Sequence, residues 1–365
     1  MRKLRSLPPA RRVLFRDTMP WLRRLGAVLL TLAACAPPTA NELVESPTVS
    51  RPARPLALRG IDLAGAEFGD VYPGQEGVDY AWPSNGDIDY FAAKGMTVVR
   101  IGFAWERLQP AANGELDAAY FAKLDALVRH AGTKGVTAIL DPHNFAKYHG
   151  AIIGTDAVPV AVFADLWRRL ATVYAGAPHV IFDLMNEPHD MPTEQWVAAA
   201  NAALVAIRET GATNVVQVPG NGWTGAYSWK SSDYGTPNAV AMLDIVDPGD
   251  NMVFEAHQYL DADAGGEASS CVSRTIGSER LQPFLEWLRA NGKRGFIGEL
   301  AGGHDRTCNE AIEDMLTTIE GASDVLDGWV WWAAGPSWGS YPFSLQPVGG
   351  KDMPLMKVLA PHLGR

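Results

Sequence analysis

Glu187 in "FDLMNEPHD" and Glu299 in "GFIGEL" each follow a short apolar run typical of a buried strand. An apolar setting raises the pKa of a carboxyl group, so the group can hold a proton near neutral pH and donate it. A protonated carboxyl that faces an ionised one suits the hydrolysis of a glycosidic bond. Taken alone, the first motif is also explained as a simple Asn-Glu-Pro turn.

Within such a pair, we expect Glu187 to be the acid/base and Glu299 to be the nucleophile. Arg100 could hydrogen-bond Glu299 and keep it ionised, and Tyr259 could donate to the same carboxylate. His257 could orient Glu187 or tune its pKa. The alternative for Arg100 is a buried ion pair with a purely structural role.

Other side chains near the pair could bind a sugar. We expect His143 and Asn186 to bind substrate hydroxyls, and Asn186 is well placed for the sugar 2-hydroxyl. His143 is about as easily explained as a core histidine. Trp331 and Trp332 cannot both point inward on one strand, because side chains alternate between its faces. We expect Trp332 to offer the apolar face for the sugar ring.

The chain has 12 tryptophans, which suit both a core and the stacking of sugar rings. Trp105, Trp223, Trp229 and Trp338 lie near strand ends or in the loops that follow them. We expect about half of these four to line a cleft, and we assign Trp223 and Trp338 to substrate binding.

Competing chemistries have weaker support. The sequence has no G-x-S-x-G elbow, no H-E-x-x-H and no P-loop, and no C-x-x-C or histidine cluster suggests a structural metal. A metal site built from Glu187, His257 and Glu299 can be imagined, but these residues lack a recognisable ligand spacing. We expect the activity to need no cofactor and no metal.

Eight β-rich runs alternate with segments of helical periodicity from Leu56 onward. The runs are "ALRGIDLAG", "MTVVRIGF", "VTAILDPHN", "VIFDLMNEP", "NVVQVPGN", "MVFEAHQY", "GFIGEL" and "GWVWWAAG". Strands that alternate with helices indicate a parallel sheet, and eight such units in about 300 residues predict a closed (β/α)8 barrel. A doubly wound open sheet is the alternative, but no G-x-G-x-x-G follows the first run.

A barrel places its chemistry at the C-terminal ends of its strands. Six of the eight runs end in or near polar or aromatic side chains. These side chains are Arg100, His143, Asn186 with Glu187, His257 with Tyr259, Glu299 and Trp332. One polar strand end carries little information, but six that converge on one face are hard to explain as solvation.

The first 55 residues differ from the rest. Residues 1–24 are basic, a short apolar run follows, and small residues precede a break, which together predict a secretory signal over residues 1–35. "LAAC" resembles the lipobox of bacterial lipoproteins, and this resemblance implies lipidation of Cys35. Ordinary cleavage within residues 33–40 is the alternative, and Met19 is an alternative start. Residues 36–55 predict a Pro-rich tether, and residues 56–365 the catalytic domain.

Charge argues against two classes of partner. Without residues 1–34 the chain has 23 basic and 40 acidic residues, a net charge of −17. We therefore expect neither nucleic acid nor an anionic membrane surface as a partner, and contact with a membrane only through the lipid. Export permits disulfides, and with Cys35 assigned to the lipid, Cys271 and Cys308 remain.

The chain resembles glycoside hydrolase family 5, in particular its subfamily of bacterial and fungal endo-β-1,4-glucanases. "GAEFG", "RIGFAWERLQP", "DPHNFAKYHG", "FDLMNEPH", "PGNGWTGAYSW", "HQYLD", "GFIGELAGG" and "WWAAGP" carry the resemblance, over about residues 56–360. The resemblance implies a (β/α)8 barrel, a retaining mechanism through a glycosyl-enzyme, and a Cys271–Cys308 disulfide. It also implies roles for Arg100, His143, Asn186, Glu187, His257, Tyr259, Glu299 and Trp332. Ser337 stands where the subfamily has Trp, so we expect one sugar-binding subsite to be weaker than in the subfamily.

These observations predict an exported, monomeric endo-β-1,4-glucanase, either a cell-envelope lipoprotein or secreted, that cuts internal bonds of cellulose or β-glucan. A retaining mechanism requires carboxyl groups about 5–5.5 Å apart. One alternative is a β-mannanase or another β-glycanase that uses the same residues. The other, from a different class, is a glycan-binding surface lipoprotein without turnover.

Overall fold

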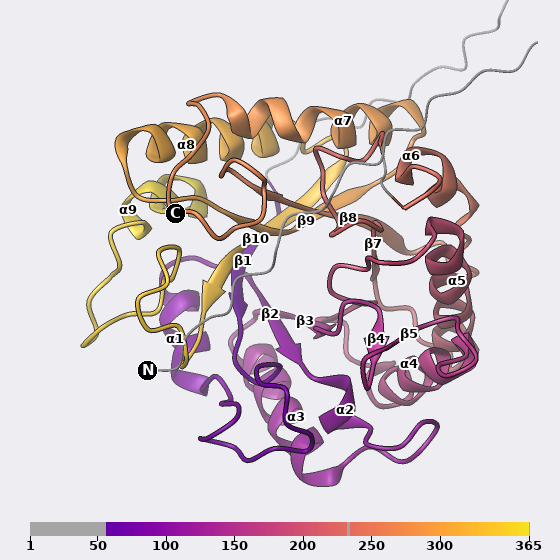
Figure 1. The fold of residues 1–365 in the computed structure, drawn as a ribbon. Helices are drawn as coiled ribbons and strands as arrows, with labels where there is room; N and C mark the ends of the chain where they lie inside the picture. The colour runs from indigo at the N-terminus through magenta and orange to yellow at the C-terminus, as the bar shows by residue number, and fades with distance from the viewer. Residues whose placement is uncertain (1–55, 232–233, 365) are drawn as a thin grey trace, which may run out of the picture. The chain divides into compact units, whose positions relative to one another are not determined.

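The computed structural model describes residues 56–231 and 234–364 (Figure 1). The predicted signal segment, the tether and Cys35 lie outside the described residues. Within the part that is described, no helix has the length and the apolar character needed to cross a membrane.

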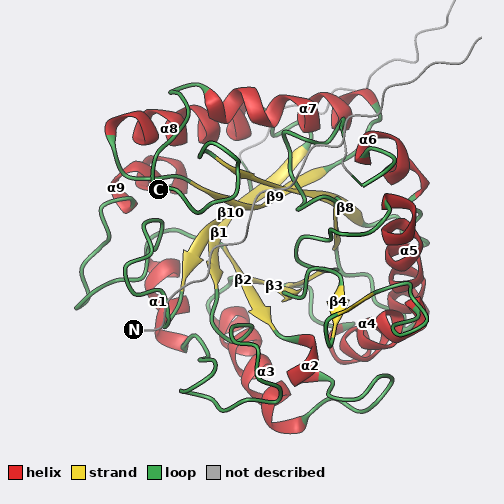
Figure 2. Cartoon of the chain, viewed as in Figure 1, coloured by secondary structure: helices red, strands yellow, loops and turns green. Residues whose placement is uncertain are grey.

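Eight parallel strands form a closed barrel in the order β1-β10-β9-β8-β7-β6-β3-β2, with the long helices around it (Figure 2). The strands are β1 (Leu58–Leu63), β2 (Val98–Phe103), β3 (Thr137–Pro142), β6 (Val180–Asp183), β7 (Val216–Pro219), β8 (Met252–Tyr259), β9 (Gly295–Ala301) and β10 (Leu326–Ala334). Each of the eight β-rich runs of the sequence overlaps one of these strands. The predicted (β/α)8 barrel is confirmed, and the open sheet is excluded.

Nine α-helices, two 3-10 helices and a small hairpin complete the described part of the chain. The helices are α1 (Asn85–Ala93), α2 (Trp105–Leu108), α3 (Ala118–Thr133), α4 (Val160–Tyr174), α5 (Thr193–Glu209), α6 (Asn238–Ala241), α7 (Ile276–Ala290), α8 (Arg306–Gly321) and α9 (Met356–Leu359), with 3-10 turns η1 (Met242–Asp244) and η2 (Ala360–Leu363). The antiparallel hairpin of β4 (Lys147–Tyr148) and β5 (Ala151–Ile152) follows β3 and was not anticipated from the sequence.

Local sequence explains where the helices begin and which face they bury. Asp117 caps α3 by accepting hydrogen bonds from the backbone of Ala119 and Tyr120. The apolar side chains that recur at helical spacing in this segment, Tyr120, Leu124, Leu127 and Val128, are all buried against the barrel. At the start of α1, Ser84 and Asp87 form a reciprocal capping box.

The barrel interior has an apolar lower layer and a charged upper layer. Val98, Ile139, Ile181, Val253, Phe296 and Val330 form an apolar cluster of their own, separate from the core between strands and helices. Two residues further along four of these strands stand Arg100, Asp141, Asp183 and Glu255, all fully buried. Because side chains two positions apart share a face of a strand, both sets point into the barrel. The charged set lies toward the C-terminal ends.

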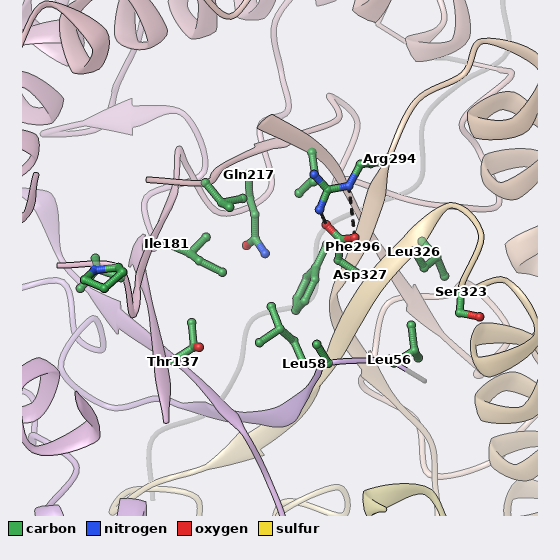
Figure 3. A pocket seen from close by; sticks show the side chains of 15 residues that line it. Leu56, Leu58, Thr137, Ile181, Gln217, Arg294, Phe296, Ser323, Leu326 and Asp327 are labelled. Carbon is green, nitrogen blue, oxygen red and sulfur yellow. Dashed lines mark hydrogen bonds and ion pairs between the residues drawn. The ribbon is translucent and has the colours of Figure 1, made fainter. Parts of the chain in front are cut away.

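A cavity of about 390 Å³ lies at the other end of the barrel, where the strands begin (Figure 3). Apolar side chains that include Leu58, Ile181 and Phe296 line it, and Gln217 points into the same region. Neither Glu187 nor Glu299 lines this cavity, so the carboxyl pair does not lie here.

The disulfide implied by the resemblance is present. Cys271 and Cys308 are bonded across 37 positions of sequence, which ties the loop after β8 to the start of α8. The same loop carries Asp263 and Glu267, which line a cavity next to Glu187. The bridge therefore anchors one wall of that cavity.

Removal of this bridge in a Cys271→Ser, Cys308→Ser double variant should lower the free energy of unfolding by about 2–4 kcal/mol. The reason is that the closed loop restricts the unfolded chain more than the folded one. Urea unfolding with and without reductant measures the change. The reduced wild type is the control and should behave like the double variant, and equal stability of the oxidised and reduced forms would contradict the expectation.

Candidate active site

The two predicted glutamates meet at the C-terminal end of the barrel. Glu187 lies in the loop after β6, and Glu299 lies near the end of β9. One carboxylate oxygen of each lies within 4.8 Å of the other and of a ring nitrogen of His257. Inverting glycosidases hold their carboxyl groups about 6.5–9.5 Å apart to admit a water, whereas retaining ones hold them about 5–5.5 Å apart. The observed proximity agrees with the retaining geometry.

Arg100 is fully buried and contacts both Glu299 and the polar side chains at the floor of the site. Its Nη1 donates to Glu299 Oε1 at 2.9 Å and to Asp62 Oδ2 at 2.7 Å. Its Nε donates to Asp183 Oδ2 at 2.8 Å, and its Nη2 to Asn186 Oδ1 at 3.0 Å. The contact with Glu299 and the buried ion pairs, which the sequence offered as alternatives, therefore occur together.

Glu299 has a hydrogen-bond donor on each oxygen. Arg100 donates to Oε1, and the hydroxyl of Tyr259 donates to Oε2 at 2.5 Å. Burial raises the pKa of Tyr259 well above its usual value, and the charge of Glu299 adds to this effect, so the phenol keeps its proton. Two donors to the charged form favour a carboxylate that is ready to attack.

The environment of Glu187 differs from that of Glu299, because it favours the protonated carboxyl group. Burial raises the pKa of Glu187, and the charge of Glu299 adds to it, against the lowering effect of a hydrogen bond from His257. His257 Nδ1 lies 2.8 Å from Glu187 Oε1. The backbone of Glu187 has a φ of 42°, a left-handed conformation that is uncommon for a residue with a side chain. The two carboxyl groups therefore have different environments: the pKa of Glu187 is raised, whereas Glu299 has a donor on each oxygen.

Asn186 and His143 are hydrogen-bonded to each other beside Glu187. Because Arg100 donates to Asn186 Oδ1, the amide presents its NH2 group to His143 Nε2 at 3.0 Å. His143 Nε2 must then accept, and the ring proton lies on Nδ1, which is 2.7 Å from Asp141 Oδ2. The chain Asp141–His143–Asn186 orients the amide that was assigned to substrate hydroxyls.

Trp331 and Trp332 point to opposite faces of β10, because side chains alternate along a strand. Trp331 is fully buried and donates from Nε1 to Phe343 O, whereas Trp332 stacks on His143 with ring centroids 5.2 Å apart. Trp338 packs edge-on against Trp332, and Trp223 is 49% exposed.

Of the four tryptophans near strand ends, Trp105 and Trp229 belong to the core instead. A chain of ring contacts runs along the mouth of the site. It comprises Trp223, Phe145, His143, Trp332, Trp338 and Tyr341, with successive centroids 5.8, 5.3, 5.2, 5.3 and 4.7 Å apart.

Beside this chain lies a cavity of about 320 Å³, lined by Glu187, Trp223, Tyr227, His257 and Tyr259 among others. The site therefore combines an open hollow at the acid with a continuous aromatic edge.

Several buried carboxyl groups were not anticipated from the sequence. Asp62, Asp141, Asp183 and Glu255 all lie within 4 Å of Arg100. Glu255 could have been found, because in "MVFEAHQY" it precedes His257 and Tyr259 at the two-residue spacing that puts all three on one face. The partners of Arg100 on other strands depend on the register of the sheet, which the sequence does not display.

Glu187, His257 and Glu299 are the one group among residues 56–231 and 234–364 close enough together to hold a metal ion. The oxygens of Glu187 and Glu299 nearest His257, and the ring nitrogen itself, already have hydrogen-bond partners within the site. We do not assign these residues as metal ligands.

Two close carboxyl groups at the C-terminal end of a (β/α)8 barrel, one with a raised pKa and one with two donors, define a retaining glycoside hydrolase. The family described as cellulase (glycosyl hydrolase family 5) matches residues 57–336. The chain belongs to this family.

Known proteins with high similarity are endoglucanases. Endo-beta-1,4-glucanase A of Emericella nidulans is 42% identical over 295 residues, which cover 80% of this chain and 87% of the relative. A solved endo-beta-1,4-glucanase of Xanthomonas axonopodis pv. citri is 49% identical with a TM-score of 0.82, covering 84% of this chain and 98% of that one. Endoglucanase Cel5A of Pseudomonas stutzeri, solved with cellobiose, is 33% identical with a TM-score of 0.77, covering 84% and 92%.

The raised pKa of Glu187 predicts the pH dependence of the reaction. The acid must be protonated to act, so kcat/KM for a glycoside should stay high above the usual glutamate pKa of about 4.3 and fall at higher pH. In a Glu187→Gln variant this alkaline limb should disappear, and the residual rate should be lower by about 10²–10⁴-fold. Initial rates between about pH 4 and pH 9, a range that covers the titration of a carboxyl group with a raised pKa, measure both effects. If the fall of kcat/KM at high pH persisted unchanged in the variant, another group would be responsible for it.

Proposed function

We propose that this protein is a retaining endo-β-1,4-glucanase that hydrolyses internal bonds of cellulose or β-glucan chains. The observation that carries the proposal is the carboxyl pair, whose oxygens lie within 4.8 Å and whose environments differ as described. The names of the relatives support the substrate class.

The geometry supports a two-step reaction. In the first step Glu299 attacks the anomeric carbon, and Glu187 gives its proton to the departing glycosidic oxygen. In the second step Glu187, now ionised, takes a proton from water as that water attacks the same carbon and releases Glu299. Two displacements at one carbon retain its configuration. Arg100 and Tyr259 hold the nucleophile in place during both steps.

An extended sugar chain fits the aromatic edge of the site. The chain of contacts from Trp223 to Tyr341 passes His143 and therefore Asn186, which lies next to the acid. Apolar ring faces suit the faces of consecutive glucose units, and a site open along an edge can take an internal segment of a chain. Trp223, Trp332 and Trp338 are the proposed platforms, and His143 and Asn186 the proposed hydroxyl ligands.

We further propose export, with Cys35 as the site of a lipid anchor or with ordinary secretion as the alternative. This part rests on the sequence of residues 1–40 alone. We also propose that the protein acts as a monomer. A β-mannanase with the same residues remains the alternative within the class, and a glycan-binding lipoprotein the alternative outside it.

Glu299→Ala tests the function directly. On carboxymethylcellulose, the wild type should lower the viscosity quickly while it releases few reducing ends, because it cuts within chains. The variant should lose both effects by at least about 10³-fold, since it lacks the attacking group.

Parallel assays on β-mannan and on carboxymethylcellulose separate the alternatives. Faster cleavage of β-mannan by the wild type would favour the mannanase. Binding of either polymer without release of reducing ends would favour the binding protein, and it would contradict the proposal. Glu115→Gln, at an exposed position of the loop before α3, is the control variant and should behave like the wild type.

A further inference from the structure

The ring of His257 lies between carboxyl groups on both of its nitrogens. Nδ1 lies 2.8 Å from Glu187 Oε1 and 3.4 Å from Glu299 Oε2. Nε2 lies 3.2 Å from Glu255 Oε1. A neutral imidazole has one N–H, so it can donate to one side only, whereas an imidazolium donates to both. The arrangement therefore suits a doubly protonated ring.

The carboxyl group of Glu255 fits into the barrel because the neighbouring strand has a glycine beside it. Its side chain is fully buried on β8, and a Cβ at position 298 of the neighbouring β9 would lie 1.5 Å from Glu255 Oε1. Only a glycine at position 298 leaves room for this carboxyl group. The nucleophile Glu299 is the next residue, so the gap that admits Glu255 lies directly beside the reacting groups.

Glu255 also lies near the buried guanidinium of Arg100. Arg100 Nε lies 3.9 Å from Glu255 Oε1. Burial raises the pKa of Asp183 on β6 well above its usual value, and the charge of Glu255 adds to this, so Asp183 can stay uncharged beside Glu255. Glu255 is left as the acceptor for His257.

Glu187 uses its two oxygens differently. Oε1 accepts from His257, and among the described residues no hydrogen bond is made to Oε2. Glu187 also lines the open hollow of the site. If Oε1 is occupied by an N–H, the acid proton must lie on Oε2, where a glycosidic oxygen can take it. If Nδ1 had no proton, Glu187 would donate to the ring instead of the substrate.

We propose that Glu255 is a positioning residue for the acid/base: by accepting the Nε2 proton of His257, it keeps Nδ1–H pointed at Glu187 Oε1 and the acid proton on Oε2. This inference rests on the proposed role of Glu187 and adds the device that orients its proton. Glu255 touches neither substrate nor the reacting atoms. Its effect passes through the ring of His257.

The charges around the ring agree with this assignment. Burial alone would lower the pKa of His257, but Glu299, Glu187 and Glu255 outweigh it and raise the pKa well above the usual value. The charged or titratable groups around Glu255 are His257 on its own strand, Asp183 on β6 and Arg100 on β2, and Glu299 on β9 approaches the same His257 ring. Loss of the Glu255 charge should lower the pKa of the Glu187–His257 pair, because one of its negative neighbours is gone.

Glu255→Gln keeps the shape of the side chain and removes its charge. On cellotetraose, whose leaving group needs protonation, kcat/KM should fall about tenfold to a hundredfold, mostly through kcat, as part of the benefit of general acid catalysis. On dinitrophenyl β-cellobioside, whose leaving group needs no acid, it should stay within about threefold of the wild type. The alkaline limb on cellotetraose should move down by about one pH unit.

Asp247→Asn is the matched control, because Asp247 is also a buried carboxylate, paired with Arg208 at 2.7 Å and outside the site. It should lower stability and leave both the ratio of the two substrates and the pH limb unchanged. If Glu255→Gln lowered kcat/KM equally on both substrates and did not shift the alkaline limb of the pH profile, the inference would be overturned. Glu255 would then have a structural role only.

A second measurement uses the wild type and so does not depend on the variant folding. In protein labelled with ¹⁵N-histidine, the His257 ring, assigned through its absence from His257→Asn, should have both nitrogens protonated at neutral pH. A neutral ring would overturn the inference. Failure of the proposed function is distinguishable, because it would appear as a wild type that turns over neither substrate.

Discussion

The buried guanidinium of Arg100 is the interaction on which the rest of the site depends. A charge placed inside a barrel costs several kcal/mol unless it is paired and hydrogen-bonded. Here the guanidinium donates to Glu299, Asp62, Asp183 and Asn186, which come from three other strands or the loops after them. Burial raises the pKa of Asp62 well above its usual value despite Arg100, and the same holds for Asp183, so these two can stay uncharged. Glu299 then lies in a cluster that is not overloaded with negative charge.

The two layers of the barrel interior have different roles: the apolar layer packs the core, and the polar layer forms the floor of the site. The lower layer is apolar and includes Val98, Ile139 and Ile181, and it packs where the strands begin. The upper layer is polar and makes hydrogen bonds across the barrel. Because both layers are carried by the same strands at a spacing of two residues, the register that packs the lower layer also aligns the upper one. The strand-borne part of the site, which includes Arg100 and Glu299, is thus aligned by the core beneath it.

The sequence predicted the barrel because the strands combine an apolar run with a polar end, as in "FDLMNEPHD". It predicted that Glu187 and Glu299 meet, because strand ends converge at one face of a barrel. It did not predict Asp183 or Glu255, because a charged residue within a strand resembles a solvent-facing one until closure of the barrel is known. The short hairpin of β4 and β5 was missed as well, since two-residue strands carry too little pattern to detect.

Because Gly298 has no side chain, positions 298 and 255 constrain each other in evolution. A methyl group there would occupy the space of the Glu255 carboxyl group, so neither residue can change alone without a clash or a void. Among homologous sequences, a larger residue at 298 should occur together with a shorter one at 255. A lineage that has made this exchange would have to hold its histidine ring by some other acceptor, and the pair 255/298 would then mark which branches orient their acid in the same way.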